Sequence, residues 1–123
     1  MQIINMEDII SILFHSRTQA HVFHLQTDSF AQHKALNAYY DGIVGLADGL
    51  AEAWQGKYGK MQFKAVNGIE QYSGVQSVVA YFEKVLRIVE EKRKGIKESY
   101  IQNLIDGIEE LIYSTLYLLK ELK

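Results

Sequence analysis

The chain has 123 residues, which suits one domain over residues 1–123 with a sizeable buried core. It contains no cysteine, which excludes disulfide bonds and thiolate metal sites, so any metal ligands must be His, Asp or Glu side chains. The net charge of −2 disfavours a strong electrostatic interaction with nucleic acid. No signal-peptide pattern and no apolar run near the ~20 residues of a membrane span is visible. We therefore expect a soluble, cytoplasmic protein without a membrane partner.

The first predicted helix runs from about Met6 to Gln26, where apolar residues recur at helical spacing, with Asn5 as its N-cap. A short polar break follows this helix. Ser29, with Gln32 three residues later, matches the capping-box pattern that starts a new helix. The second helix is therefore predicted from about Phe30 to Lys57.

Three of the four glycines in the second predicted helix lie close together, at Gly42, Gly45 and Gly49. Each costs ~1 kcal/mol relative to alanine in a helix interior. Their spacing of three and four residues places them near one stripe of the helix. Either another helix approaches closely along this stripe, or the helix is locally weakened there.

Residues 58–74 show no sustained period and are predicted to form a connection. The third helix is predicted from about Val75 to Arg93, and Gly95 marks its C-terminal end. The fourth helix is predicted from Ile96 to near the C-terminus, where the apolar stripe is strongest. The absence of proline permits long, uninterrupted helices.

Four helices of similar length, with two short turns and one longer connection, predict an all-α four-helix bundle made of two antiparallel helix hairpins. When extended, a connection of ~17 residues spans ~55 Å. A bundle of ~22-residue helices is only ~33 Å tall. The chain can therefore cross from one end of the bundle to the other, although a simple up-and-down path also fits the sequence.

A stripe about 100° wide along the second predicted helix is mostly polar. Aspartate and histidine are rarely buried in a bundle unless they are paired or bind a metal. The stripe is therefore a candidate functional surface. Its members are His33, Asn37, Asp41, Val44, Asp48 and Glu52.

Histidines and carboxylates of the first two helices are candidate metal ligands. His21 and His33 each lie six residues from a turn centred near residue 27, so we expect them to stand level. Asp48 follows His33 by 15 residues, which is ~22 Å along a helix. One subunit therefore cannot bring His33 and the pair Asp48 and Glu52 to one ion, but a two-fold dimer with antiparallel second helices can. Such ligands suit iron, and also zinc or manganese.

These residues resemble a signature of the Dps family of ferritin-like proteins. The signature is a His, twelve residues to a second His, four to an acid, eleven to an Asp and four to a Glu. Here it falls, without a gap, on His21, His33, Asn37, Asp48 and Glu52. The segments Thr18-Gln-Ala-His21 and Asp48-Gly-Leu-Ala-Glu52, together with Phe30, Leu36 and Tyr40, also match.

The resemblance implies a ferritin-like bundle with a ferroxidase centre between subunits, where Fe(II) is oxidised by peroxide or oxygen. One subunit would supply His21, His33 and the residue at Asn37, and its partner would supply Asp48 and Glu52. It also implies a homo-oligomer, at least a two-fold dimer and in the family a dodecamer. The expected role is iron storage or protection from oxidative stress.

The chain departs from the signature at Asn37, where an acid is expected. An amide is a weaker ligand for a hard cation, and Asp41, one turn further on, is a candidate replacement. His24, one turn from His21, is a candidate outer-shell group or a surface histidine. Two alternatives stay open: a non-catalytic ferritin-like bundle with a structural or interaction role, and another diiron-type or zinc protein on the same bundle.

Basic residues cluster near the predicted helix ends. Such charge usually solvates the surface and complements the helix dipole, and Glu90 and Glu91 adjoin the second cluster. Nucleic acid is therefore not an expected partner. The clusters are Lys57, Lys60 and Lys64, and Lys92, Arg93, Lys94 and Lys97.

Overall fold

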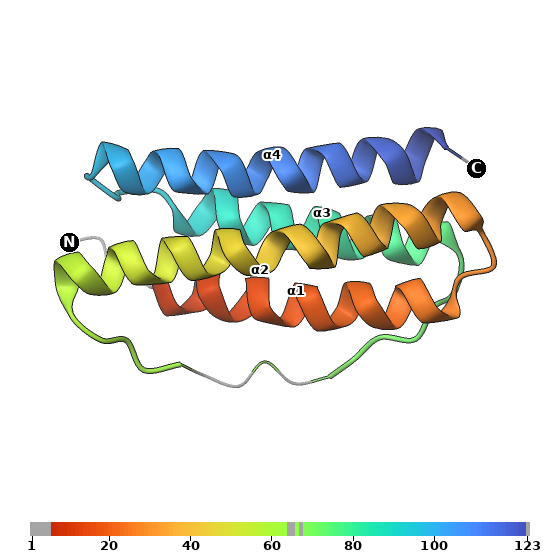
Figure 1. Cartoon of the computed structure of the whole chain (residues 1–123), viewed down its shortest axis with the longest axis horizontal. Coiled ribbons are helices and arrows are strands. Elements are labelled where there is room, and N and C mark those ends of the chain that lie inside the picture. Colours follow the sequence, from red (N-terminus) through yellow and green to blue (C-terminus); the bar gives the residue numbers. More distant parts are fainter. Residues whose placement is uncertain (1–5, 64–65, 67, 123) are drawn as a thin grey trace.

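A computed structural model of the chain describes residues 6–63, 66 and 68–122. These residues form four helices and no strand: α1 (Met6–Gln26), α2 (Phe30–Tyr58), α3 (Val75–Lys92) and α4 (Ser99–Glu121) (Figure 1). The predicted all-α four-helix bundle is confirmed. No helix in this part of the chain combines the length and apolar character needed to cross a bilayer. Asn5 and Lys64 lie outside the described residues.

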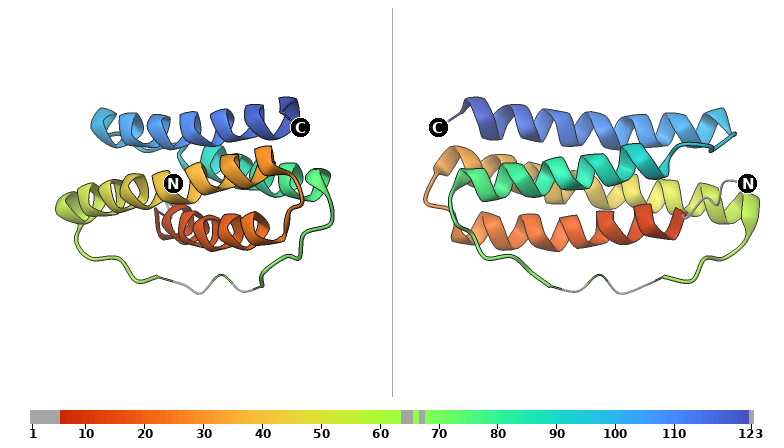
Figure 2. Two further views of the ribbon diagram at one scale, coloured as in Figure 1. Left: turned by 45° about the vertical axis from the view of Figure 1, so that its right-hand side comes forward. Right: turned by 180° about the vertical axis from the view of Figure 1, so that it is seen from behind.

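Each helix packs mainly against two neighbours, because α1 and α4 each contact both α2 and α3. α1 and α4 run in one direction along the bundle, and α2 and α3 run in the opposite direction (Figures 1 and 2). The helices of each of these packed pairs are therefore antiparallel. Since α2 and α3 run the same way, the connection between them passes along the length of the bundle beside α1 (Figure 2).

The core contains apolar side chains of all four helices, and Tyr39 of α2 is among the largest that are fully buried. Its ring lies edge-on to Phe82 of α3, with 4.7 Å between the ring centroids. Ser16 of α1 donates its hydroxyl proton to the Leu13 carbonyl at 2.7 Å, so Tyr39 must donate to Ser16 Oγ at 2.6 Å. Burial raises the pKa of Tyr39, which keeps the phenol protonated for this bond.

Only one of the two hydrogen bonds of the predicted capping box forms at the start of α2. Ser29 Oγ accepts a hydrogen bond from the Gln32 N–H at 3.2 Å. The reciprocal bond is missing, because Ser29 N–H donates to Thr27 Oγ1 at 3.2 Å and Gln32 Oε1 accepts from Thr27 at 2.7 Å. Gln32 Oε1 also accepts from the Tyr72 hydroxyl at 3.0 Å. The same glutamine thus ties the turn to the crossing connection.

Only one of the three glycines considered inside α2 faces another helix closely. A Cβ added at Gly42 would lie 3.3 Å from Leu111 Cδ2 of α4, whereas at Gly45 and Gly49 it would meet nothing within 4 Å. Close helix approach therefore explains Gly42. At Gly45, which is exposed, and at Gly49, which is half-buried, the position of a Cβ is open space.

The turn between α3 and α4 contains Gly95 at a φ of 87°, as the sequence predicts for a helix end. The prediction that α4 begins at Ile96 is wrong, since α4 begins at Ser99. Ile96 is instead buried in the turn, and its carbonyl accepts a hydrogen bond from Gln102 Nε2 at 3.0 Å. This bond holds residues 96–98 out of the helix.

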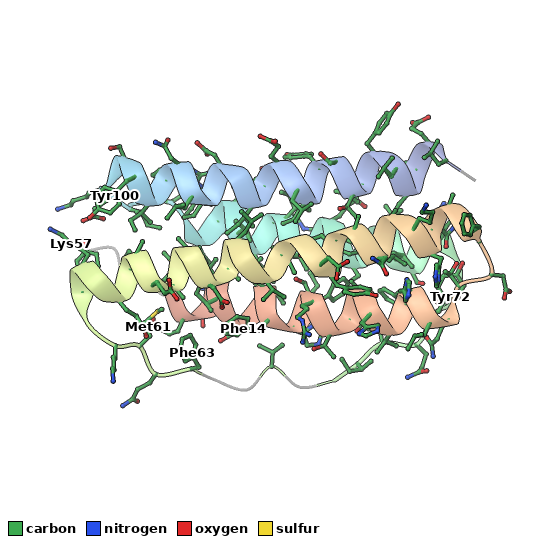
Figure 3. The ribbon with its side chains drawn as sticks, in the orientation of Figure 1. Phe14, Lys57, Met61, Phe63, Tyr72 and Tyr100 are labelled. Atoms are coloured by element: carbon green, nitrogen blue, oxygen red, sulfur yellow. The ribbon has the colours of Figure 1, made fainter. Side chains whose placement is uncertain are left out.

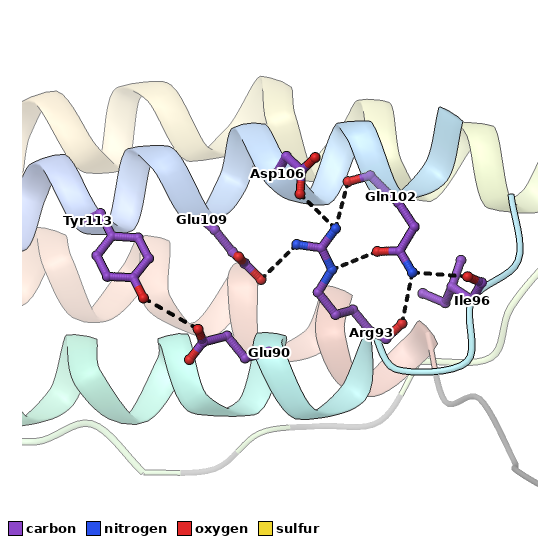
Figure 4. A network of polar contacts seen from close by, with 7 residues as sticks. All are labelled: Glu90, Arg93, Ile96, Gln102, Asp106, Glu109 and Tyr113. Carbon is purple, nitrogen blue, oxygen red and sulfur yellow. Dashed lines mark hydrogen bonds and ion pairs between the residues drawn. The ribbon is translucent and has the colours of Figure 1, made fainter. Parts of the chain in front are cut away.

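Arg93, at the end of α3, forms a network with the first turns of α4 (Figure 4). Its Nε donates to Gln102 Oε1 at 2.6 Å, and Gln102 Nε2 donates to the Arg93 carbonyl at 3.1 Å. The guanidinium also pairs with Asp106 at 2.7 Å and with Glu109 at 3.0 Å. Its neighbours are paired too, Lys92 with Asp8 and Lys94 with Glu91. Three basic residues of the second cluster are thus engaged within the chain.

Side chains of α1 hold the crossing connection by its main chain. Gln19 forms two hydrogen bonds with Glu70, accepting from its N–H at 2.8 Å and donating to its carbonyl at 2.9 Å. Gln26 accepts from the Tyr72 N–H at 2.8 Å. Near the start of the connection, Phe63 lies beside Phe14 of α1, with 6.1 Å between the ring centroids (Figure 3).

His15 completes this set of contacts. Its Nε2 lies 2.6 Å from the Gly68 carbonyl, which can only accept, so Nε2 carries a proton. Its Nδ1 lies 2.6 Å from the Tyr81 hydroxyl of α3. Burial raises the pKa of Tyr81, so the phenol stays protonated and has a proton to donate to His15 Nδ1. His15 therefore joins α1, α3 and the connection.

We predict that Gln102→Ala lowers the free energy of unfolding by about 1–3 kcal/mol, because it removes several hydrogen bonds of a part-buried network at once. Asn103→Ala is the matched control, since Asn103 is exposed on the same helix, and a change within about 0.5 kcal/mol is expected there. Urea unfolding followed by circular dichroism measures both. Equal effects of the two substitutions would show that the network does not stabilise the turn.

Candidate metal site

The polar stripe of α2 lies on the side that neither α1 nor α4 covers. Asp41, Asp48 and Glu52 are exposed, and Val44 is 37% exposed. His33, nearer the turn to α1, is half-buried. The chain therefore places its histidine and carboxylate stripe at the surface, where the ionised groups keep their hydration.

His33 packs against His24 of α1. The two rings are stacked, with 3.6 Å between centroids and 23° between planes. His24 Nδ1 lies 2.8 Å from the His33 carbonyl, and His33 Nδ1 lies 2.9 Å from the His24 carbonyl. Each histidine thus bonds to the main chain of the other. We call this reciprocal pair the histidine clasp.

The clasp fixes the protonation pattern of both rings. A carbonyl oxygen only accepts hydrogen bonds, so each Nδ1 must carry a proton. When the rings are neutral, the lone pair of each Nε2 is then available. A metal-bound histidine commonly has this arrangement, with its other ring nitrogen donating to a carbonyl or a carboxylate. His33, which is the more exposed of the two, therefore has the donor chemistry of a metal ligand.

The structure places His24, and not His21, against His33. α1 ends at Gln26 and α2 begins at Phe30, so the turn is centred about one residue later than the sequence suggested. His21 lies further from the turn, and its ring stacks on Tyr40 with 4.4 Å between centroids. The His21 ring is exposed and lies 5.9 Å from the His24 ring, measured between centroids.

Tyr40, Asn37 and Asp41 form a hydrogen-bonded chain beside His21. Asp41 Oδ2 accepts a bond from Asn37 Nδ2 at 2.9 Å. Because an ionised carboxylate only accepts, the Asn37 amide nitrogen must face Asp41 and its oxygen must face Tyr40. The Tyr40 hydroxyl donates to that oxygen at 2.7 Å. The orientation of the Asn37 amide is thus fixed at both ends.

Within the described part of the chain, no three His, Asp or Glu side chains lie close enough together to hold a metal ion. His33 and Asp48 are on one helix and 15 residues apart, which is ~22 Å. The structure therefore brings His33 to His24, and His21 to the Tyr40 group, but leaves Asp48 and Glu52 at a distance from both.

A hollow of about 560 Å³ lies on the exposed side of α2. All of its lining residues come from this one helix, so it is an open groove between neighbouring side chains of α2, with no second element opposite them in the described chain. Phe30 and Lys34 stand at one end, where the ammonium group lies 5.5 Å from the centre of the Phe30 ring. Phe30 is 72% exposed. The lining residues are Phe30, His33, Lys34, Asn37, Ala38 and Asp41.

The sequence did not reveal the contacts of His24 with His33 or of Tyr40 with Asn37. The signal for His24 was its position, since it lies two residues before the end of α1 and His33 lies three residues after the start of α2. Tyr40 lies three residues after Asn37, which sets the two side chains on one helix face. Neither spacing alone reveals which hydrogen bonds form.

A model of a family of unknown function, DUF5856, matches residues 24–119 of the chain. This range contains α2, α3, the connection between them and most of α4, and it begins at His24. No curated protein and no solved structure matches the chain.

We predict that His24→Ala lowers the free energy of unfolding by about 1–3 kcal/mol, because it removes the buried His24 ring, its stacking on His33 and its hydrogen bond to the His33 carbonyl. His21→Ala is the matched control, since His21 is exposed and keeps only a ring contact, and less than about 1 kcal/mol is expected. Thermal unfolding in the presence of a chelator compares them. A larger loss for His21→Ala would contradict the role given to the clasp.

Proposed function

The chain belongs to the DUF5856 family, and we propose that it is a ferritin-like protein that binds iron between two subunits and oxidises Fe(II) there. The observation that carries this proposal is the exposed stripe of α2, with His33 near one end and Asp48 and Glu52 near the other. Iron is the substrate and the cargo in this proposal, and the α2 side chains are its ligands.

The spacing within the stripe suits a two-fold site. His33 and Asn37 are four residues apart, and so are Asp48 and Glu52. In an antiparallel pair of α2 helices, a register that sets His33 opposite the partner's Glu52 therefore also sets Asn37 opposite the partner's Asp48. The two-fold axis repeats this arrangement, so the dimer has two equal sites.

The exposed side of α2 also has complementary charge and open space for a second copy. His33 and the adjacent Lys34 lie near one end of α2, and Asp48 and Glu52 lie toward the other. Antiparallel packing therefore sets basic groups opposite acidic ones. Between these ends, Gly45 has no atom near the position of a Cβ, which lets a second helix approach closely. The second copy would also cover the open side of the hollow.

The donor set fits iron. In the neutral ring of His33 the Nε2 lone pair is available, because the proton is on Nδ1, which is engaged in the clasp, and His21 has an exposed ring. The partner's Asp48 and Glu52 would supply hard carboxylate oxygens. Imidazole and carboxylate ligands together suit Fe(II), and the carboxylates favour Fe(III) after oxidation. Two Fe(II) ions give two electrons to hydrogen peroxide, which with two protons yields two Fe(III) ions and two water molecules.

The path of the chain supports the ferritin-like part of the proposal. α1 pairs with α2 and α3 pairs with α4, and each pair is joined by a short turn. The longer connection links the two pairs and runs along the length of the bundle beside α1 (Figure 1). Two antiparallel helix hairpins with a crossing connection are the arrangement of ferritin-like bundles.

A second candidate function is a non-catalytic bundle that keeps the two-fold surface and serves a structural or interaction role. The amide of Asn37 favours it, because this residue stands where the Dps-like signature has an acid and both ends of the amide are already bonded. This candidate predicts a dimer that binds at most one metal ion per site and does not turn over Fe(II).

We predict that the double substitution Asp48→Asn with Glu52→Gln weakens anaerobic Fe(II) binding by more than ~100-fold, because loss of outer-shell partners alone costs 10–100-fold and here two direct ligands are lost. Glu110→Gln is the control, since Glu110 is exposed on α4. Calorimetry measures binding, and the near-ultraviolet absorbance of Fe(III) after peroxide is added measures oxidation. Equal binding by all three proteins would rule out this site. Binding without oxidation would select the second candidate.

We predict that two inactive variants restore each other when mixed. One variant carries His21→Ala and His33→Asn, and the second carries the Asp48 and Glu52 changes. Asparagine at residue 33 keeps an N–H near the position of Nδ1 but has no Nε2. Random assortment makes half of the dimers mixed, with one intact site each, so about a quarter of the wild-type Fe(II) capacity should return. No recovery after subunit exchange, verified by light scattering, would exclude a site shared between subunits.

A further inference from the structure

We propose that Asp41, and not Asn37, supplies the acid of the metal site, and that Asn37 and Tyr40 are positioning residues that hold its carboxylate in place. This inference rests on the proposed function and refines its ligand set. It starts from the hydrogen-bonded chain Tyr40–Asn37–Asp41, which lies beside His21 on the exposed side of α2.

Asn37 is poorly disposed to bind a cation. Only its amide oxygen could act as a ligand, and that oxygen already accepts the Tyr40 hydroxyl proton at 2.7 Å. The other end of the amide is an N–H donor that faces Asp41 at 2.9 Å. Turning the amide over would set its oxygen against the Asp41 carboxylate, which repels it. The signature position is therefore occupied by a group that orients others.

Asp41 has the right chemistry at nearly the same place. Helical side chains lean toward the N-terminus, and the bond to Asn37 Nδ2 confirms that the Asp41 carboxylate reaches back toward the level of residue 37. One carboxylate oxygen is engaged in this bond, and the other can bind a metal ion. Second-shell hydrogen bonds of this kind commonly orient carboxylate ligands. Asp41 and His33 also line the same hollow.

In the two-fold arrangement, a cation would relieve the repulsion between the Asp41 carboxylate and a carboxylate of the partner. In the register described above, the partner's Asp48 stands opposite residue 37, where the Asp41 carboxylate is held. Two carboxylates that face each other repel unless a proton or a metal ion lies between them. His21, whose ring stacks on Tyr40, adds a nitrogen donor at this level. A divalent cation between Asp41, His21 and the partner's Asp48 removes the repulsion.

The test uses Zn²⁺ alone as the probe, with its affinity measured by calorimetry on the dimer. Asp41→Asn should weaken Zn²⁺ binding about tenfold or more, because it removes the proposed ligand. Asn37→Ala should weaken it by about tenfold, because it removes the residue that orients that ligand. Tyr40→Phe should have a smaller effect of the same sign. Glu110→Gln is the matched control and should bind as the wild type does.

A swap separates a ligand role from a structural one. The double variant Asn37→Asp with Asp41→Asn keeps the amide–carboxylate bond and moves the acid to the signature position. It should bind Zn²⁺ much more tightly than Asp41→Asn alone. Wild-type affinity in Asp41→Asn, with the Asp48 and Glu52 variant still deficient, would overturn this inference and leave the proposed function standing. No Zn²⁺ or Fe(II) binding by the wild type would overturn both.

Discussion

α2 packs against α1 on one side and against α4 on another, and this packing determines which of its side chains are buried and which are exposed. α2 is the longest helix, with 29 residues, and within the described chain its remaining side has no helical neighbour. A bundle core tolerates few ionised groups, because burial removes their hydration. The chain therefore keeps aliphatic and aromatic residues on the two packed sides of α2 and collects His33, Asp48 and Glu52 on the uncovered one. The proposed dimer and its metal sites both follow from that division.

The helices were predictable because burial repeats with the helical period. The bounds of α1 agree with the prediction, and α2 and α3 each differ by one residue at their C-terminal ends. The start of α4 was not predictable in this way. Ile96 is apolar and buried, as a helix residue would be, but its carbonyl is engaged by Gln102 across the turn. A period reports which residues are buried, and it does not report which main-chain groups are taken by side chains.

The candidate site was also predictable only in part. The sequence located the stripe of α2 and its separation into two halves, because both depend only on helical geometry. It did not predict that His24 would meet His33, since a shift of about one residue in the turn decides which histidines are level. Nor did it predict that the Asn37 amide would be hydrogen-bonded at both ends, to Tyr40 and to Asp41. A motif assigns a position along the chain, whereas the hydrogen bonds of Asn37 show which atoms stand there.

The connection between α2 and α3 had no recognisable pattern, and its contacts explain why. Gln19 and Gln26 bind it by the main-chain groups of Glu70 and Tyr72, which every residue except proline possesses. The side chain at residue 70 is exposed and takes no part in these bonds. Most substitutions at residue 70 therefore leave both bonds in place, whereas loss of the Gln19 side chain removes both. At this point the tolerance for variation lies in the connection, and the side chain that holds it in place lies 51 residues earlier, on α1.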